Sequence, residues 1–295
     1  MQSEINDVRR IESIDRSQFQ REYAAKGKPF VLTTSQRTRA AAAKWDLNYL
    51  AGEQGHIRVT VEYYPDGDRN KPSDHQAMTV NDYVEKIRNA SERHKYYLAE
   101  ELLSRVLPDL AKEVPRPSFI EEEDKPVAVV FIGVDSYTGF HYHVAPTEAF
   151  LMQISGTKRV LLVSRERYRS LYPRGWFRAR HNWSRTALNP GGGRELLGSM
   201  LHTMLADGRY PKAANVPIVD CVLQEGEGLF IPQGWFHAVY GVGESISITH
   251  FFTGSRRHAH PPILVRDSLA MMRKRWISRP LKRMARLLPR SSSIY

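Results

Sequence analysis

Short apolar runs separated by turn residues dominate the chain from residue 125 onward. Each run is rich in Val, Ile, Leu and Phe. The runs lie at residues 127–132, 149–154, 159–163, 228–231 and 246–252. Because they follow one another without intervening helical periodicity, the pattern predicts a mainly β fold of the sandwich or jelly-roll type, with its core at residues 121–255.

The first 120 residues have a mixed pattern, which predicts an α/β part packed on that core. Strands are expected at 30–34 and 57–63. Helical periodicity is found at 37–50, 80–87 and 96–107. Residues 164–217 are irregular and are interpreted as a long insertion between the two halves of the core.

Composition narrows the class of protein without naming a function. The chain has 295 residues, of which 41% are hydrophobic and 25% are charged, values typical of a soluble globular protein. Cys221 is the single cysteine, so an intramolecular disulfide and a cysteine-rich metal site are excluded. The first residues are acidic rather than basic and apolar, which is unlike a signal peptide, and we therefore expect a cytoplasmic protein.

The positive charge is concentrated at the C-terminal end. The formal net charge is +11, and residues 256–295 contain eleven Lys and Arg against one acid, Asp267. This basic tail is expected to be helical, with an amphipathic stretch at 281–288. We expect it to pack on its own core or to form a homodimer. Contact with a membrane surface is a less favoured alternative, and nucleic-acid binding is not expected.

Three histidines are candidates for a metal site. His141 and His143 are two residues apart in a β-rich segment, so one strand can direct both imidazoles to one side. His237 follows a Pro-Gln-Gly turn at the start of another expected strand. Three imidazoles from two strands leave other coordination positions open, which suits iron(II) that binds a co-substrate and dioxygen together, although zinc, copper and nickel also bind such ligands.

The segments around these histidines resemble the Jumonji-C branch of the cupins. The second cupin motif, Gly-x5-Pro-x-Gly-x2-His, is complete from Gly226 to His237, and the first segment reads Thr138-Gly-x-His141-x-His143. The chain is most similar to the Jumonji-domain-containing 6 type over about residues 28–255. The resemblance implies a double-stranded β-helix core, with the N-terminal α/β elements and the C-terminal helical extension outside it.

The same resemblance implies a function. Members of this branch are iron(II)- and 2-oxoglutarate-dependent oxygenases that hydroxylate peptide, protein or amino-acid-like substrates with dioxygen. By correspondence with the motif, His141 and His237 would be iron ligands. Lys158 would pair with the far carboxylate of 2-oxoglutarate, and Thr138 and Thr249 would donate hydroxyl hydrogen bonds to it.

Several positions depart from the pattern of the family. An acid normally stands where this chain has His143, and an asparagine stands where the chain has Leu151. With a third imidazole, the site keeps the full +2 charge of iron until the 2-oxoglutarate dianion neutralises it. Strict alternation also places Thr138 and His141 on opposite faces, so the expected role of Thr138 requires a strand break at Gly139.

These departures leave alternatives open. Glu148 lies at the cupin offset from His143 and could complete a site of three histidines and one glutamate. In another register His143 would be the first histidine and Ala145 the missing acid, as in related halogenases. A three-histidine dioxygenase that does not use 2-oxoglutarate, and a non-catalytic cupin that only binds a ligand, are the remaining candidates.

Overall fold

The structure is a computed structural model that describes most of the chain. The described residues are 8–33, 40–69, 71–114, 116–178, 180–186, 208–214 and 216–285, with side chains described up to residue 273.

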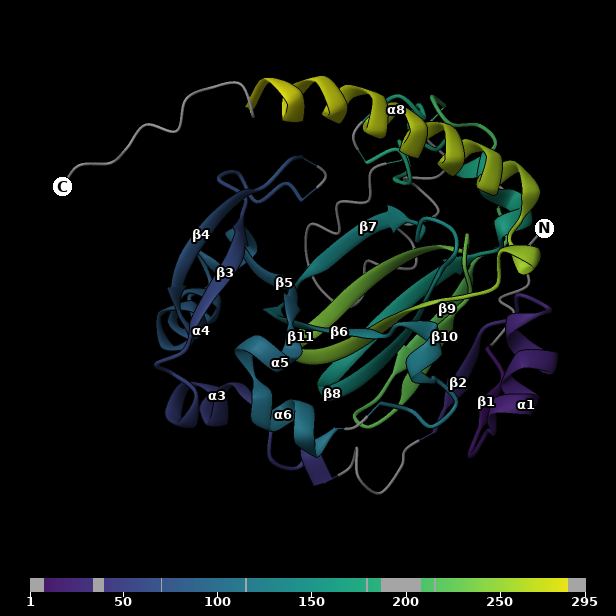
Figure 1. Cartoon of the computed structure of the whole chain (residues 1–295). Coiled ribbons are helices and arrows are strands. Elements are labelled where there is room, and N and C mark those ends of the chain that lie inside the picture. Colours follow the sequence, from purple (N-terminus) through teal and green to yellow (C-terminus); the bar gives the residue numbers. More distant parts are fainter. Residues whose placement is uncertain are drawn as a thin grey trace.

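A mixed sheet of 11 strands forms the framework of the protein. Two long strands, β8 (Thr147–Val163) and β11 (Phe236–Thr253), pair antiparallel at its centre (Figure 1). The other core strands are β6 (Val127–Val134), β7 (Tyr137–His141), β9 (Val219–Leu223) and β10 (Gly228–Ile231). The predicted mainly β, cupin-type core, with α/β elements before it and a helix after it, is confirmed.

The N-terminal residues extend this sheet at both ends. β1 (Arg10–Ile11) and β2 (Phe30–Leu32) continue it beyond β10. At the other end β5 (Tyr96–Leu102), β3 (Arg58–Tyr63) and β4 (Asp74–Thr79) follow β6. The N-terminal part is therefore built into the same sheet as the core.

Short helices connect these strands, and one long helix ends the described chain. They are α1 (Arg16–Gln18), the π-helix η1 (Phe19–Ala24), α3 (Leu47–Glu53), α4 (Val80–Arg88), α5 (Leu103–Val106), α6 (Pro108–Glu113), the 3₁₀ turns η2 (Arg93–Lys95), η3 (Glu122–Asp124), η4 (Arg165–Leu171) and η5 (Arg256–His258), and α8 (Pro261–Ala285). In the described residues, no helix is long and apolar enough to span a bilayer.

The predicted local elements fit the structure unevenly. The strand expected at 57–63 is β3, and the helix expected at 80–87 is α4, which begins at a capping box formed by Thr79 and Asp82. Of the helix expected at 37–50, residues 40–42 are helical, the helix is interrupted at 43–46, and α3 begins at Leu47 after an Asp46 cap; residues 34–39 lie outside the described part. The helix expected at 96–107 is wrong for residues 96–102, and only its second part is helical, as α5 at Leu103–Val106.

Residues 96–102 form β5 because their backbone pairs with strands on both sides. Tyr96 and Tyr97 pair with β3, and Leu98 pairs with Ile132 of β6. Both tyrosines are buried, although consecutive strand residues point to opposite faces. Burial on both faces removes the alternation that would have marked a strand, and the run then looks helical in sequence.

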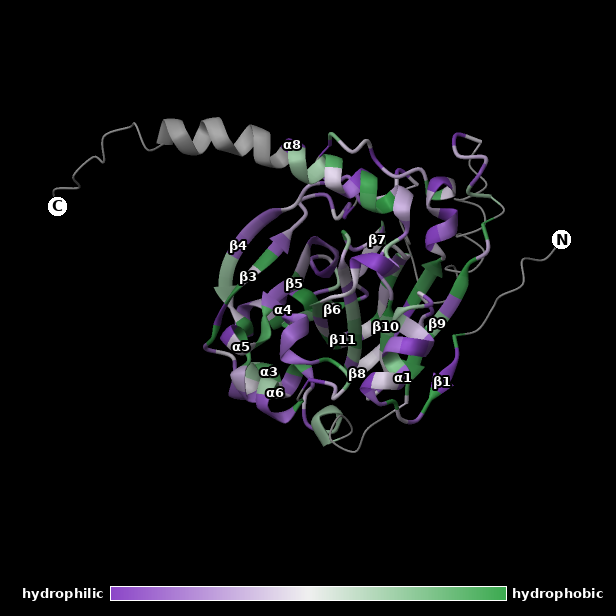
Figure 2. Cartoon of the chain, turned by 45° about the vertical axis from the view of Figure 1, so that its right-hand side comes forward, coloured by the Kyte–Doolittle hydropathy of each residue, from purple (hydrophilic) through white to green (hydrophobic). Residues whose placement is uncertain are grey.

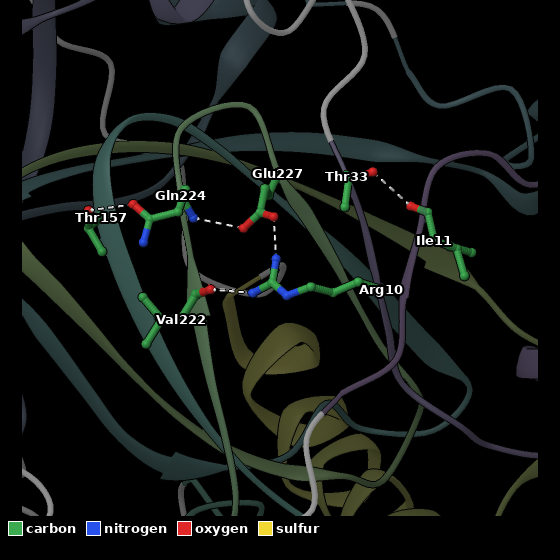
Figure 3. Close-up of polar contacts among 7 residues, drawn as sticks. All are labelled: Arg10, Ile11, Thr33, Thr157, Val222, Gln224 and Glu227. Carbon is green, nitrogen blue, oxygen red and sulfur yellow. Dashed lines mark hydrogen bonds and ion pairs between the residues drawn. The ribbon is translucent and has the colours of Figure 1, made fainter.

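The N-terminal edge strand also fixes the turn that leads into the second histidine motif. The Arg10 guanidinium donates to the Glu227 carboxylate, and its Nη2 donates to the Val222 carbonyl at 2.8 Å (Figure 3). Glu227 in turn accepts a hydrogen bond from the Gln224 amide at 3.0 Å. The turn between β9 and β10 is therefore fixed by Arg10 of the edge strand and by a hydrogen bond within the turn itself.

Helix α8 lies across the end of the sheet next to β7 (Figures 1 and 2). Ile263, Asp267 and Ala270 are buried between this helix and the core. Val265 and Leu269, on another face, are exposed at 60% and 38%. The first turns of the basic tail therefore pack on the chain's own core, as expected, while the expected amphipathic stretch at 281–288 lies beyond the described side chains. A homodimer through this helix stays a prediction.

Candidate metal centre

Two strands bring the first two histidines directly opposite each other. His141 is the last residue of β7 and His237 the second residue of β11, and they are register partners in the antiparallel pair. Facing residues on neighbouring strands have their Cβ atoms only about 5 Å apart. Gly234, with a φ of +79° in the preceding Pro-Gln-Gly turn, occupies a conformation that favours glycine and delivers the chain into β11.

His143 completes the group from the segment that follows β7. The candidate ligand atoms of His141, His143 and His237 all lie within 4.8 Å of one another. The ring of His237 is centred 4.2 Å from that of His141 and 4.5 Å from that of His143. The sequence-predicted imidazoles thus converge in space. Three neutral nitrogens at this separation can serve as ligands to one metal ion.

The tautomers of two rings are fixed by the backbone. His141 Nδ1 donates to the Gly139 carbonyl at 2.9 Å, and His237 Nδ1 donates to the Trp235 carbonyl at 3.1 Å. Each Nε2 therefore carries the lone pair, an orientation typical of metal-binding histidines. The Nδ1 of His143 is buried and has no hydrogen-bond partner among the described residues, so this ring is not fixed in the same way.

Burial keeps the three imidazoles neutral. It lowers the pKa of His141 to about 4 and that of His143 to about 3, and it lowers the pKa of His237 well below its usual value. Neighbouring rings of the group contribute to the lowered pKa of His143 and His237. Near neutral pH their nitrogens are consequently available to bind a cation rather than a proton.

A bulge in β7 brings Thr138 to the same side as His141. Thr138 is paired with Val239, whereas His141 is paired with His237, so β7 has one more residue than β11 between these pairs. The extra residue reverses the alternation locally. Both Thr138 and His141 line the pocket that contains the histidines, as the sequence-based expectation of a break near Gly139 requires.

Lys158 is a buried cation on the wall of this pocket. It comes from β8, is 2% exposed, and donates to the Ser247 hydroxyl. Its ammonium also lies 5.6 Å from the centre of the Phe131 ring. No carboxylate of the described residues forms an ion pair with it, and burial lowers its pKa to about 7. A ligand carboxylate would restore the missing counter-charge.

Leu151 and Thr249 face each other beside the lysine. They are register partners on β8 and β11, and both line the pocket. Leu151 therefore gives the pocket an apolar side chain at the position where the related subgroup has an asparagine. We call six of the residues that β7, β8 and β11 contribute to the pocket the strand-built wall: Thr138, His141, Leu151, Lys158, His237 and Thr249. The cavity volume is about 90 Å³, several times the roughly 10–15 Å³ that one water needs.

Glu148 is not part of this group, so the alternative site of three histidines and one glutamate is not formed. Its neighbours on β8, Ala149 and Leu151, line the pocket, and strand alternation directs Glu148 to the opposite face. There it is 1% exposed, next to Gly254 and Gln233, and burial raises its pKa to about 8. The cupin offset counted along the sequence does not account for this alternation.

Side chains from loops close the other side of the pocket, and the sequence analysis missed them. Trp183 stacks on His141, with ring centres 5.2 Å apart and planes at 22°. The Arg180 guanidinium lies 4.9 Å from the Trp183 ring, and both residues line the pocket. Arg69 lies over the Tyr97 ring at 4.6 Å, and its buried Nη1 has no hydrogen-bond partner among the described residues. Arg69, Arg180 and Trp183 are called the loop-built wall below.

Two carboxylates lie on the same pocket and were also missed. Glu62 of β3 accepts a hydrogen bond from the Tyr64 hydroxyl at 2.7 Å. Glu100 of β5 has a φ of +58°, at an irregularity in the pairing with β6. Glu100 is exposed at the surface of the protein but is partly desolvated where it lines the pocket, and this desolvation and the Glu62 charge raise its pKa. The pocket therefore presents acidic as well as basic groups to a ligand.

Asp267, the lone acid of the basic tail, supports the first histidine segment from α8. Its carboxylate accepts hydrogen bonds from the Tyr142 hydroxyl at 2.7 Å and from the Ala145 amide at 2.9 Å. It also lies 3.2 Å from Nε2 of His181, in the insertion. Ala145 is thus tied to α8 and does not line the pocket, which gives no support to the register expected for halogenases.

Comparison with known proteins places this geometry in a family. A family model described as a cupin-like domain matches residues 16–258. The chain is 27% identical over 243 residues to lysine-specific demethylase JMJ30 of Arabidopsis thaliana, covering 80% of this chain and 52% of that protein. It is 26% identical over 263 residues to Jumonji C domain-containing protein 5 of Drosophila melanogaster, covering 83% and 60%.

Another relative has a different kind of name. The chain is 27% identical over 269 residues to human tRNA wybutosine-synthesizing protein 5, covering 82% of this chain and 78% of that protein. By contrast, it spans half to three fifths of the length of the first curated relatives. Because the family model covers most of the chain, the protein belongs to the cupin-like domain family, together with Jumonji-C enzymes.

Proposed function

We propose that the protein is an iron(II)- and 2-oxoglutarate-dependent oxygenase. The observation that carries the proposal is the convergence of three neutral imidazoles, in two of which Nδ1 is bonded to the backbone and Nε2 is left to bind a metal. His141, His143 and His237 would hold the metal. Iron with 2-oxoglutarate supplies the activation of dioxygen in this class of enzyme. The residues described here bind and orient the reactants and exclude water.

Charge supports 2-oxoglutarate as the co-substrate. Three neutral imidazoles leave an iron(II) ion with its full +2 charge, which the two carboxylates of 2-oxoglutarate balance. Lys158 offers a buried ammonium for the carboxylate far from the metal, and Thr138 and Thr249 offer hydroxyl groups on the same pocket. A buried cation gains most from such a partner because little water competes for it.

The reaction we propose is hydroxylation of a C–H bond in a substrate that enters past the loop-built wall. The resemblance to the Jumonji-C branch favours a peptide, protein or amino-acid-like substrate. The names of the relatives include both lysine-specific demethylases and a tRNA wybutosine-synthesizing protein. Glu62 and Glu100 provide carboxylates for a cationic or amino group of the substrate.

Anaerobic reconstitution of the full chain tests the proposal. We expect one iron(II) per chain by metal analysis, and a visible absorption band when 2-oxoglutarate is added. On admission of oxygen in the presence of candidate peptide and amino-acid substrates, succinate should form together with the hydroxylated substrate. Oxygen consumption without succinate would instead indicate a three-histidine dioxygenase whose substrate itself binds the metal. Failure to bind any divalent metal would contradict both readings and leave a cupin that only binds a ligand.

A further inference from the structure

The insertion carries a dense group of arginines that the oxygenase proposal does not use. Residues 165–185 contain seven arginines and a single acid, Glu166. The second half of this segment folds back on itself. The Arg174 amide donates to the Trp183 carbonyl at 2.8 Å, and the Arg185 amide donates to the Tyr172 carbonyl at 3.0 Å. We call residues 172–185, of which residue 179 is not described, the arginine hairpin.

The arginine hairpin forms one side of a groove that other elements complete. The hairpin residues that line the groove are Arg174, Gly175, Phe177, Arg178 and Arg185. The other lining residues are Tyr210, which precedes β9, and Arg273, which belongs to α8. The groove has a volume of about 860 Å³. Four of the seven described lining residues are arginines and none is acidic, so the groove is suited to a polyanion.

Three of the four arginines in this groove have no ion-pair partner among the described residues. Arg178, Arg185 and Arg273 are exposed, and none of them forms an ion pair with another described residue. Burial, together with the neighbouring charges of Arg180 and Arg178, lowers the pKa of Arg174. Mutual repulsion among these guanidinium groups would be relieved by an anionic ligand with several charges.

Exposed aromatic rings stand beside the arginines. Trp176 is 40% and Phe177 is 52% exposed, and their ring centres are 6.0 Å apart. The Arg178 guanidinium lies 5.9 Å from the Phe177 ring. Flat rings next to cations are the combination with which proteins bind single-stranded nucleic acid, because bases stack on the rings while arginines contact phosphates.

The hairpin is joined to the strand that bears the first histidine. The Ser184 amide donates to the Phe140 carbonyl at 2.8 Å, and the Tyr142 amide donates to the Asn182 carbonyl at 3.1 Å. The same hairpin contributes Arg180 and Trp183 to the metal pocket. A nucleic-acid strand lying in the groove would therefore contact the same hairpin that lines the metal pocket.

From these observations we infer that the groove binds single-stranded nucleic acid, DNA or RNA, through its phosphates and bases. An acidic peptide would find the cations but would have no use for the exposed rings. A membrane presents a flat surface, whereas the arginines here surround a concave one. The inference departs from the expectation drawn from the sequence, because that expectation considered the basic tail and not the insertion. Binding of nucleic acid in this groove requires neither a bound metal nor catalytic turnover.

Fluorescence anisotropy with labelled oligonucleotides tests this inference. The probes are 12-nucleotide RNA and DNA of the same mixed sequence, measured in EDTA against the full chain. We expect R178A/R273A to weaken binding about tenfold or more, and to reduce the salt slope by about 1.4, since each lost phosphate contact on a single strand contributes about 0.7. K26A/K112A removes two exposed cations elsewhere and should leave both quantities unchanged.

Two further measurements locate the bound strand. R178K/R273K keeps the charge and should recover most of the affinity, which a loss of folding would not. Crosslinking of a 5-bromouridine oligonucleotide should label the peptide that contains Trp176 and Phe177. Comparison of the RNA and DNA probes identifies the preferred strand. Equal binding by R178A/R273A and K26A/K112A, crosslinks confined to the basic tail, or equal competition by poly-glutamate or phosphatidylserine vesicles would overturn the inference.

Discussion

One wall of the metal pocket consists of strand residues held in register, whereas the other consists of side chains from loops. In the strand-built wall, backbone pairing sets which residues face the pocket: His237 is opposite His141, and Thr249 is opposite Leu151. In the loop-built wall, Trp183 and Arg180 reach the pocket because the arginine hairpin docks on β7. The first arrangement suits groups whose separation must be constant, and the second suits groups that select a substrate.

Replacing a ligand in the strand-built wall should have the largest effect. We expect H237A to lower iron(II) affinity by at least about 100-fold, since even changes in residues that orient ligands cost 10–100-fold. Metal analysis after anaerobic reconstitution and gel filtration measures this. H75A, on the exposed part of β4, is the matched control. Retention of stoichiometric iron by H237A would show that the three imidazoles do not form the site.

Replacing Lys158 should affect the co-substrate rather than the metal. We expect K158M to keep its iron and to bind 2-oxoglutarate about 30-fold or more weakly, because a buried charged partner is lost. In the wild type, the lysine with a pKa of about 7 binds a carboxylate only when protonated. The dissociation constant should therefore rise about tenfold between pH 6 and pH 8. Anaerobic titration measures both, and a pH-independent constant would contradict the assigned role.

The K158M variant should also have a higher melting temperature than the wild type. The folded pKa of Lys158 lies below the value of 10.5 expected for an exposed lysine, so the unfolded chain binds more protons between pH 7 and pH 10.5. Stability conferred by this group therefore rises with pH in that window. The gain in melting temperature of K158M should be larger at pH 6.5 than at pH 9, and thermal melts at these values compare them.

A substitution in the loop-built wall should have the smallest effect on iron(II) affinity. W183L removes a ring that stacks on His141 but removes no ligand. Since such ring pairs contribute about 0.5–1.5 kcal/mol, we expect iron affinity to remain within about tenfold of the wild type. W176L, at the exposed tip of the same hairpin, should leave it unchanged. A loss comparable to that of H237A would show that the two walls do not differ in the way described.

The same contrast explains what the sequence could predict. His141, His143 and His237 were found because motif spacing reflects strand register, which is local, whereas Lys158 was implied by the resemblance to the Jumonji-C cupins. Even the need for a break near Gly139 followed from alternation. Glu148 was left open as a further ligand because of its offset along the chain, and strand alternation directs it to the other face of β8 instead.

The loop-built wall could not be found in this way, because the docking of a loop depends on contacts far apart in the chain. Arg69 is held by rings from several segments, and Trp183 by pairing with β7. Two signals were nevertheless present in the sequence. One is the run of arginines at 165–185, and the other is the lone acid Asp267 in a basic segment. The lone carboxylate in this basic segment is the one that accepts hydrogen bonds from Tyr142 and Ala145.

Asp267 has a consequence for how the protein is made. Chains are synthesised from the N-terminus, and the carboxylate that accepts from Tyr142 and Ala145 is encoded more than a hundred residues later. Until α8 has left the ribosome, the loop that carries His143 into β8 lacks the acceptor that fixes it. The nascent chain can therefore pair its strands before this loop is fixed, and the candidate metal centre is completed only when α8 is in place.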